Sequence, residues 1–147
     1  MPKVISVNIS GKKGTRKIPV PSLTLKENFG AVGDAHASAL WHRQVSLLAI
    51  ESIKKMRASG LDVKEGDFAE NITTDGIELI SLSVGARLLV GDVLIEITQI
   101  GKHCHTKCEI YKLAGDCIMP TEGVFAKVLK GGEIKKGDRI NLLTDHA

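Results

Sequence analysis

Residues 101–108, GKHCHTKC, hold the densest group of side chains able to do chemistry, and they follow an alternating stretch at 93–98. A thiol acts as a nucleophile or soft-metal ligand only as thiolate, which nearby cations stabilise. Lys102, Lys107 and protonated histidines flank Cys104. We therefore predict that Cys104 is the reactive thiol. A small, partly buried cysteine beside solvent-facing histidines is the alternative.

The same segment also contains residue types that bind zinc: His103, Cys104, His105 and Cys108. In an extended segment the two histidines would face one way and the two cysteines the other, and no second ligand pair follows at a standard interval. The spacing therefore argues against structural zinc. Cys104 and Cys108 could instead form a redox or persulfide-resolving pair if the loop folds back.

The third cysteine, Cys117, stands next to Asp116, whose carboxylate would oppose thiolate formation. We interpret Cys117 as a structural thiol. Three cysteines cannot all pair with one another, and thiols of cytosolic proteins are normally reduced. A disulfide framework is therefore not expected.

Length and composition predict one soluble domain over residues 1–147, with 43% apolar and 25% charged residues. No apolar run approaches the roughly 20 residues of a membrane span, and no signal peptide is recognisable. We expect a cytoplasmic protein with no membrane partner. The net charge of +3 is too small to suggest nucleic-acid binding. The basic cluster at 12–17, KKGTRK, is interpreted as a solvated hairpin tip, with an anionic ligand as the lesser alternative.

Period-2 alternation predicts three strands, at 3–9, 93–98 and 139–142. In the first, Ile5, Val7 and Ile9 would share one face, with Val4, Ser6 and Asn8 on the other. The second and third strands each follow a Gly-Asp pair, at 91–92 and 137–138, which combines a permissive backbone with a turn-forming carboxylate. These pairs are predicted to start strands.

One helix is expected at 48–59, where apolar residues recur at helical spacing, Glu51 can pair with Lys55, and Gly60 can end the helix. Residues 123–131 fit either a strand or a helical turn, and we favour a strand. Many short strands and one helix predict a mainly β fold: a closed or partly open β-barrel with one or a few short helices.

Five sequence blocks, in order, resemble the successive motifs of MOSC domains, the family named after the C-terminal domain of molybdenum cofactor sulfurases. Together they cover most of the chain, and five blocks in the right order are difficult to obtain by chance. The blocks are GDAH at 33–36, RQVSL at 43–47, GDFAENITTDG at 66–76, residues 79–92 together with the interval 99–104, and residues 123–138.

The resemblance implies a β-rich barrel of the stand-alone bacterial type. In the sulfurases the neighbouring domain is a pyridoxal-phosphate cysteine desulfurase, so pyridoxal phosphate would here belong to a separate partner. The family cysteine, thought to carry sulfane sulfur or to contact molybdenum, corresponds to Cys104. His103 stands where the family often has proline, and Ala69 stands where it usually has glycine.

The resemblance also implies a site in which Cys104 is the catalytic thiol or molybdenum ligand. His36 and Arg43 would contact the anionic phosphate of the molybdenum cofactor, molybdopterin, because an arginine fork suits phosphate. Glu70 and Asn71 would lie in the same mouth, with the Asn71 amide holding backbone or pterin.

Each of these residues also has a structural interpretation. Arg43 could pair with Asp34 or Asp67, Asn71 could be a turn-former, and His36 could be an ordinary loop histidine.

Three functional hypotheses follow. The first is an accessory protein of molybdenum cofactor metabolism, which carries sulfane sulfur or binds the cofactor and works with a cysteine desulfurase or cofactor-biosynthesis proteins. The second is a component of a molybdenum-dependent oxidoreductase. The third is a non-enzymatic module that docks on another biosynthetic protein.

Overall fold

The computed structural model describes residues 2–12, 16–35, 37–39, 42–101 and 122–144. Eleven strands, one α-helix and one short 3-10 helix occur in these ranges. Neither helix in these described ranges is long and apolar enough to cross a membrane.

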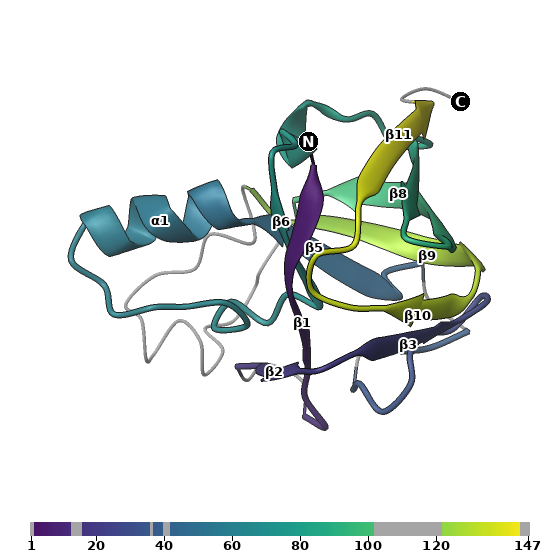
Figure 1. Ribbon diagram of the computed structural model, residues 1–147, viewed down its shortest axis with the longest axis horizontal. Helices are drawn as coiled ribbons and strands as arrows, with labels where there is room; N and C mark the ends of the chain where they lie inside the picture. The colour runs from purple at the N-terminus through teal and green to yellow at the C-terminus, as the bar shows by residue number, and fades with distance from the viewer. Residues whose placement is uncertain (1, 13–15, 36, 40–41, 102–121, 145–147) are drawn as a thin grey trace.

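Eight strands form one strongly curved sheet in the order β11-β7-β8-β9-β5-β6-β1-β2 (Figure 1). All neighbours are antiparallel except β5 and β6, which run parallel and are joined through the helix α1. The strands are β1 (Lys3–Ile9), β2 (Ile18–Val20), β5 (Val45–Ala49), β6 (Ile72–Asp75), β7 (Arg87–Val90), β8 (Val93–Ile100), β9 (Val124–Lys130) and β11 (Ile140–Thr144).

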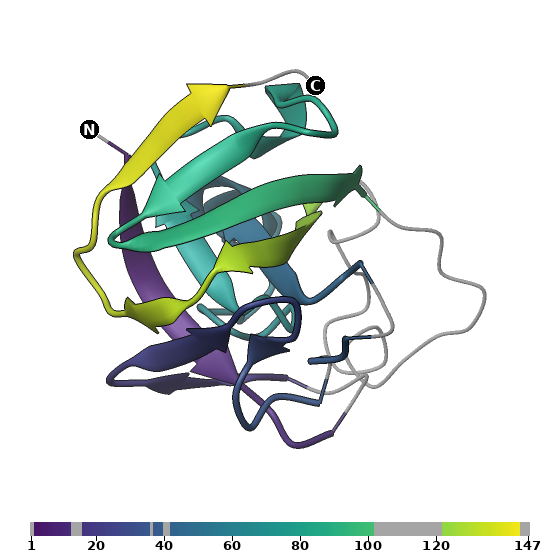
Figure 2. The same cartoon turned by 90° about the vertical axis from the view of Figure 1, so that its right-hand side faces the viewer.

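The curvature brings β1, next to last in this order, to the start of β11 at the opposite end, where Lys3 forms an isolated bridge with Arg139, the residue before β11. Backbone hydrogen bonds from Val4 N to Asp138 O and from Gly137 N to Val4 O, both 2.8 Å, support that contact. The prediction of a mainly β, partly open barrel is therefore confirmed. Figure 2 shows the strands wrapping around a common interior.

A second, three-stranded sheet has the order β10-β3-β4. It consists of β3 (Leu23–Lys26), β4 (Gly30–Ala31) and β10 (Gly132–Ile134). Leu23, Leu25, Ala31 and Ile134 from this sheet belong to the same buried cluster as the barrel residues. The small sheet therefore closes one side of the interior.

Strand β1 differs from its predicted pattern. Val4 and Val7 both lie in the barrel core, whereas Ile5 packs against a second cluster on the outer side. The register with β6 shifts between Val4 and Ser6. Because a β-bulge adds one residue to a strand, it reverses the faces of the residues beyond it. Val7 and Ile9 therefore share the core face as predicted, whereas the placement of Ile5 on that face was wrong.

Strand β8 and the two Gly-Asp turns follow the prediction. Val93, Ile95 and Ile97 are all completely buried in the barrel core. Gly91 connects β7 to β8 with φ +57°, and Gly137 precedes β11 with φ +95°, both in the left-handed region that glycine tolerates best. Strand β9 also confirms the strand interpretation of residues 123–131.

The helix α1 spans Ile50–Ala58, two residues later than predicted, because Leu48 and Ala49 complete β5. Ile53 and Met56 pack on the outer cluster, as their spacing indicated. This outer cluster comprises Leu48, Ile50, Ile53, Val63, Phe68 and Phe125, and it covers the outside of β5.

The end of α1 is as predicted, since Gly60 follows it with φ +100°. The ion pair is not, because Lys55 contacts Glu122 rather than Glu51.

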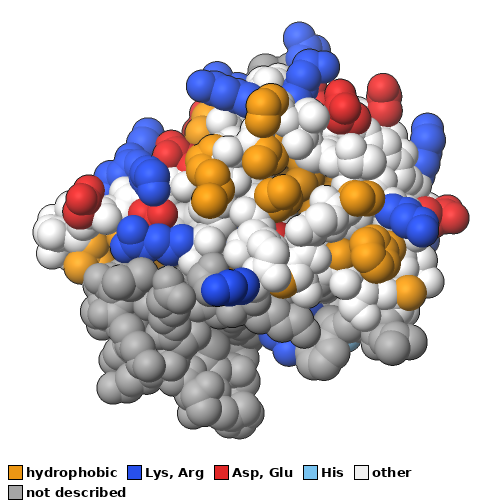
Figure 3. All heavy atoms as spheres, turned by 90° about the horizontal axis from the view of Figure 1, so that it is seen from below, with side chains coloured by type: hydrophobic (Ala, Val, Ile, Leu, Met, Phe, Trp, Pro, Cys, Tyr) orange, Lys and Arg blue, Asp and Glu red, His pale blue; other side chains and the backbone are white. Residues whose placement is uncertain are grey.

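The molecule seen from below in Figure 3 carries apolar side chains in separate groups, with acidic and basic side chains around them. Ile18 and Val32 are the most exposed large apolar residues among those described within residues 1–50, at 70% and 52%. The charged side chains seen on this face in Figure 3 include both acidic and basic residues.

Candidate functional site

Two of the five predicted site residues, Cys104 and His36, lie outside the described residues, as do the proposed zinc ligands of 103–108 and Cys117. Arg43, Glu70 and Asn71 are described. In the part of the chain that the structure covers, no three His, Cys, Asp or Glu side chains gather as a metal site would require.

Arg43 is half-buried and lies two residues before the start of β5. Its guanidinium carbon lies 5.4 Å from the ring centroid of Phe125 on β9, within the range of a cation–π contact. Phe125 pairs in the sheet with Gln99 of β8 and with Ser46 of β5. The arginine therefore lies on the outer face of the sheet, near the end of the β8–β9 pair.

That end of the sheet is where the cysteine segment begins and finishes. Gly101 N donates to Gly123 O at 2.6 Å, so the described residues on the two sides of segment 102–121 are side by side. Glu122, the first described residue after it, accepts a hydrogen bond of 2.5 Å from Ser52 Oγ and pairs with Lys55 on α1. The base of the segment is thus fixed to the sheet and to the helix.

Asn71 is completely buried and ties β5 to β1. Its Oδ1 accepts a hydrogen bond from Ser46 N at 3.0 Å, and its Nδ2 donates to Asn8 O at 3.2 Å. The Asn71 amide thus holds two backbone groups in the structure, whereas its contact with a pterin stays a prediction.

Glu70 is also completely buried. Its Oε2 accepts hydrogen bonds from Gly66 N at 2.9 Å and from Thr73 Oγ1 at 2.7 Å, whereas Oε1 has no hydrogen-bond partner among the described residues. Desolvation by burial raises the pKa of Glu70 from 4.5 to about 7, against the opposing effect of those hydrogen bonds. This carboxyl can therefore exchange a proton near neutral pH.

Asn8 of β1 links the two neighbouring residues. Its Nδ2 donates to Glu70 O at 3.1 Å and to Thr73 Oγ1 at 3.3 Å, and its backbone N donates to Asn71 O at 2.8 Å. Glu70, Asn71, Asn8, Thr73 and Ser46 thus form one buried hydrogen-bonded network. In it Glu70 and Asn71 brace the loop of residues 64–71 against β1 and β5.

The basic cluster contains a residue that the sequence interpretation placed wrongly. Lys17 was expected in a solvated hairpin tip, but its side chain is fully buried and its Nζ lies 2.7 Å from Asp34 Oδ1. The same oxygen accepts a hydrogen bond from Ser10 N at 3.0 Å. Lys17 therefore fixes the turn that begins the GDAH block, whereas Lys12 is exposed as expected.

Asp67, the other carboxylate considered for Arg43, has Lys64 Nζ at 3.1 Å and Arg16 at 3.9 Å. Lys17 and Asn8 were not singled out as site residues. No local sequence pattern marks Lys17 as buried. Its burial depends on an ion pair with Asp34, which is 17 residues further along the chain.

Ala69 stands where MOSC domains usually have glycine, and its backbone has a φ of +64°. This left-handed conformation, which glycine adopts most easily, accounts for that preference. The left-handed conformation costs a non-glycine residue about 1–2 kcal/mol, and glycine's greater freedom in the unfolded chain offsets about 0.5–1 kcal/mol of that. We expect Ala69→Gly to raise the free energy of unfolding by up to about 1 kcal/mol, measured by urea denaturation. Ala58→Gly in α1 should have the opposite sign, and a destabilised Ala69→Gly variant would contradict this account.

Comparison with solved structures gives the same fold. The YuaD protein of Bacillus subtilis superposes with a TM-score of 0.77 at 18% identity, covering 95% of this chain and 94% of that one. YiiM of Geobacillus stearothermophilus gives 0.74 at 19% identity, with 98% and 76% covered. YiiM of Escherichia coli gives 0.69 at 19% identity, with 99% and 71% covered.

Among curated protein sequences none matches the chain. The family model described as MOSC domain matches residues 26–141, a range that includes all five sequence blocks. With both the model and the fold in agreement, this chain belongs to the MOSC domain family.

Proposed function

We propose that this MOSC domain serves molybdenum cofactor metabolism as a sulfur carrier, with Cys104 accepting sulfane sulfur from a separate cysteine desulfurase. Membership of a family related to molybdenum cofactor sulfurases supports the cofactor class. The desulfurase, with its pyridoxal phosphate, would be the partner.

The observation that carries the proposal is the place of Arg43. Its guanidinium lies over Phe125, whose strand partner Gln99 is two residues before Gly101. Three residues of chain separate Gly101 from Cys104, and such a length reaches at most about 11 Å. This supports a site in which the arginine and the thiol act on the same ligand.

Arg43 is the described residue suited to hold the phosphate of the molybdenum cofactor. The contact with Phe125 engages the face of the guanidinium, and the planar fork of an arginine suits phosphate oxygens. Molybdenum, when the cofactor is bound, would supply redox chemistry. His36 is the second predicted phosphate contact. Glu70 and Asn71 would act by bracing the loop that adjoins this site.

The sulfur step needs no further oxidant. The Cys104 thiolate attacks the outer sulfur of the desulfurase persulfide, a new S–S bond forms on Cys104, and the donor's S–S bond breaks to release its thiolate. Cationic neighbours favour the attacking thiolate, and the product is a persulfide on Cys104.

The test is to incubate the protein with a cysteine desulfurase and cysteine, alkylate it, and map the peptides by mass spectrometry. We expect one added sulfur atom on the Cys104 peptide, and its loss in Cys104→Ser. Cys117→Ser is the matched control and should load as the wild type does. An unmodified Cys104 peptide in a folded protein would exclude the sulfur-carrier role.

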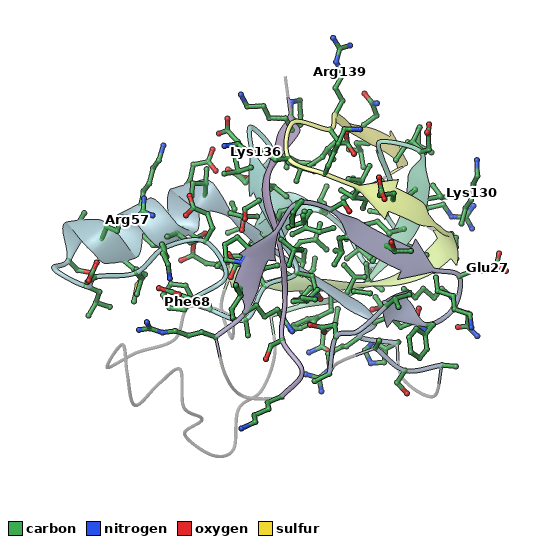
Figure 4. All side chains as sticks on the ribbon, turned by 60° about the horizontal axis from the view of Figure 1, so that its bottom comes forward. Glu27, Arg57, Phe68, Lys130, Lys136 and Arg139 are labelled. Carbon is green, nitrogen blue, oxygen red and sulfur yellow. The ribbon has the colours of Figure 1, made fainter. Side chains whose placement is uncertain are left out.

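The same variants separate the other two hypotheses. For an oxidoreductase component, molybdenum and pterin should copurify from a cofactor-producing host with the wild type and not with Cys104→Ser. For a binding module, Cys104→Ser should keep partner binding while Arg43→Ala loses it. Arg139→Ala is the control for lost positive charge, because Arg139 projects into solvent (Figure 4).

A further inference from the structure

A pocket of about 360 Å³ lies between the first turns of α1 and the connection from β6 to the short helix η1 (Leu79–Ser81). This volume is within the range of small-molecule sites, about 300–1,000 Å³. The pocket is at the Ala49 end of β5, whereas Arg43 precedes the other end. Six residues of strand span about 20 Å, so Arg43 lies far from the Ala49 side of the pocket, whereas Glu122 in the pocket lining directly follows the cysteine segment.

The inner wall of the pocket is apolar. Ala49, Ile77, Leu79 and Ile80 line it. Leu79 is 2% exposed and anchored in the barrel core, while Ile80 is 49% exposed. A large aliphatic side chain left half in water gains by contact with an apolar ligand. The wall therefore suits a short hydrocarbon chain.

The pocket lining carries more negative than positive charge, with three glutamates and one lysine. Lys55 is already paired with Glu122, which also accepts the Ser52 hydroxyl hydrogen bond. Glu51 accepts only a long hydrogen bond of 3.4 Å from Gly76 N, and Glu78 accepts one from Ser81 Oγ. Neither Glu51 nor Glu78 has an ion pair within the described ranges, so two carboxylates at the mouth lack a cation.

We propose that this pocket binds a small organic cation, a primary amine or guanidinium on a short aliphatic chain. The ammonium lies between Glu51 on α1 and Glu78 before η1, and the hydrocarbon chain lies along Ile77, Leu79 and Ile80. An anion is disfavoured because the pocket's lysine is already neutralised by Glu122. The anionic phosphate of the molybdenum cofactor proposed above does not suit this pocket.

The test is an NMR titration with hexylamine, followed through the backbone amides of Ser52 and Gly76, with hexanol and hexanoate as the matched neutral and anionic compounds. We expect saturable binding of hexylamine at millimolar concentration, and binding of hexanol and hexanoate weaker by about tenfold or more. Each surface charge contact is expected to raise the binding affinity a few-fold, so that two contacts together raise it about tenfold.

The double variant Glu51→Gln and Glu78→Gln should lower the affinity for hexylamine about tenfold. Glu27→Gln should leave it unchanged, since Glu27 is exposed on the side of the molecule away from α1 (Figure 4). Equal binding of hexanoate, an undiminished affinity in the double variant, or no saturation by hexylamine would each overturn the proposal. Urea denaturation of every variant verifies that it is folded.

Discussion

Replacing Lys17 by methionine is expected to lower the free energy of unfolding by about 3–5 kcal/mol, the largest loss of stability that we predict for a single substitution. The side chains of Lys17 and Asp34 are both fully buried, with Nζ 2.7 Å from Oδ1. The substitution takes from the buried Asp34 carboxylate the ammonium that lies against it, and loss of one partner from a buried ion pair is strongly destabilising. The loss should appear as a lower urea midpoint in equilibrium denaturation.

Two variants make this expectation specific. Lys12→Met removes an exposed lysine of the same basic cluster and should change stability by less than about 0.5 kcal/mol. Combining Lys17→Met with Asp34→Asn removes both charges and keeps an acceptor for Ser10 N, so it should cost less than Lys17→Met alone. A Lys17→Met variant as stable as Lys12→Met would show that the pair contributes nothing.

Stability should also fall as the pH rises from about 5 to about 8, because of Glu70. Its pKa is raised from 4.5 to about 7 in the folded protein, so folding favours the protonated form. The stabilisation is complete below pH 4.5, declines as the unfolded chain ionises, and is lost above about pH 7. At about 1.4 kcal/mol per pH unit, the raised pKa corresponds to about 3 kcal/mol.

Urea denaturation across this pH range checks the effect, and Glu70→Gln isolates it. The amide keeps an acceptor for Gly66 N and Thr73 Oγ1 but cannot ionise, so its profile should be flatter by about 3 kcal/mol. Its stability at pH 5 should be no higher than that of the wild type. Glu133→Gln, at an exposed glutamate, should keep the wild-type slope. Identical slopes for wild type and Glu70→Gln would refute the role of Glu70.

The sequence by itself determined the fold class and much of its local structure. Alternation located β8 and most of β11, and the Gly-Asp pairs marked the turns before both strands. These features could be predicted because they depend on neighbouring residues: a period of two and a backbone that must enter the left-handed region. The order of the five blocks likewise indicated the family, which the family model bears out.

Only the tertiary structure decided which faces and which polar groups are buried. The bulge in β1 arises from its pairing with β6, more than 60 residues away in the chain, so alternation within β1 placed Val4 and Ile5 on the wrong faces. Lys17 is buried because the fold brings Asp34 to it, although its own sequence context is that of a solvated turn.

The candidate site divides in the same way. Residue type and family order singled out Cys104, His36, Arg43, Glu70 and Asn71, but the roles of Glu70 and Asn71 depend on contacts with β1 and β5 that no local pattern contains. Burial is a property of the assembled chain, and burial is what raises the pKa of Glu70 and makes Asn71 a brace. The sequence thus indicated which residue types could form the site, and the packing of the folded chain determined that Glu70 and Asn71 are buried supporting groups.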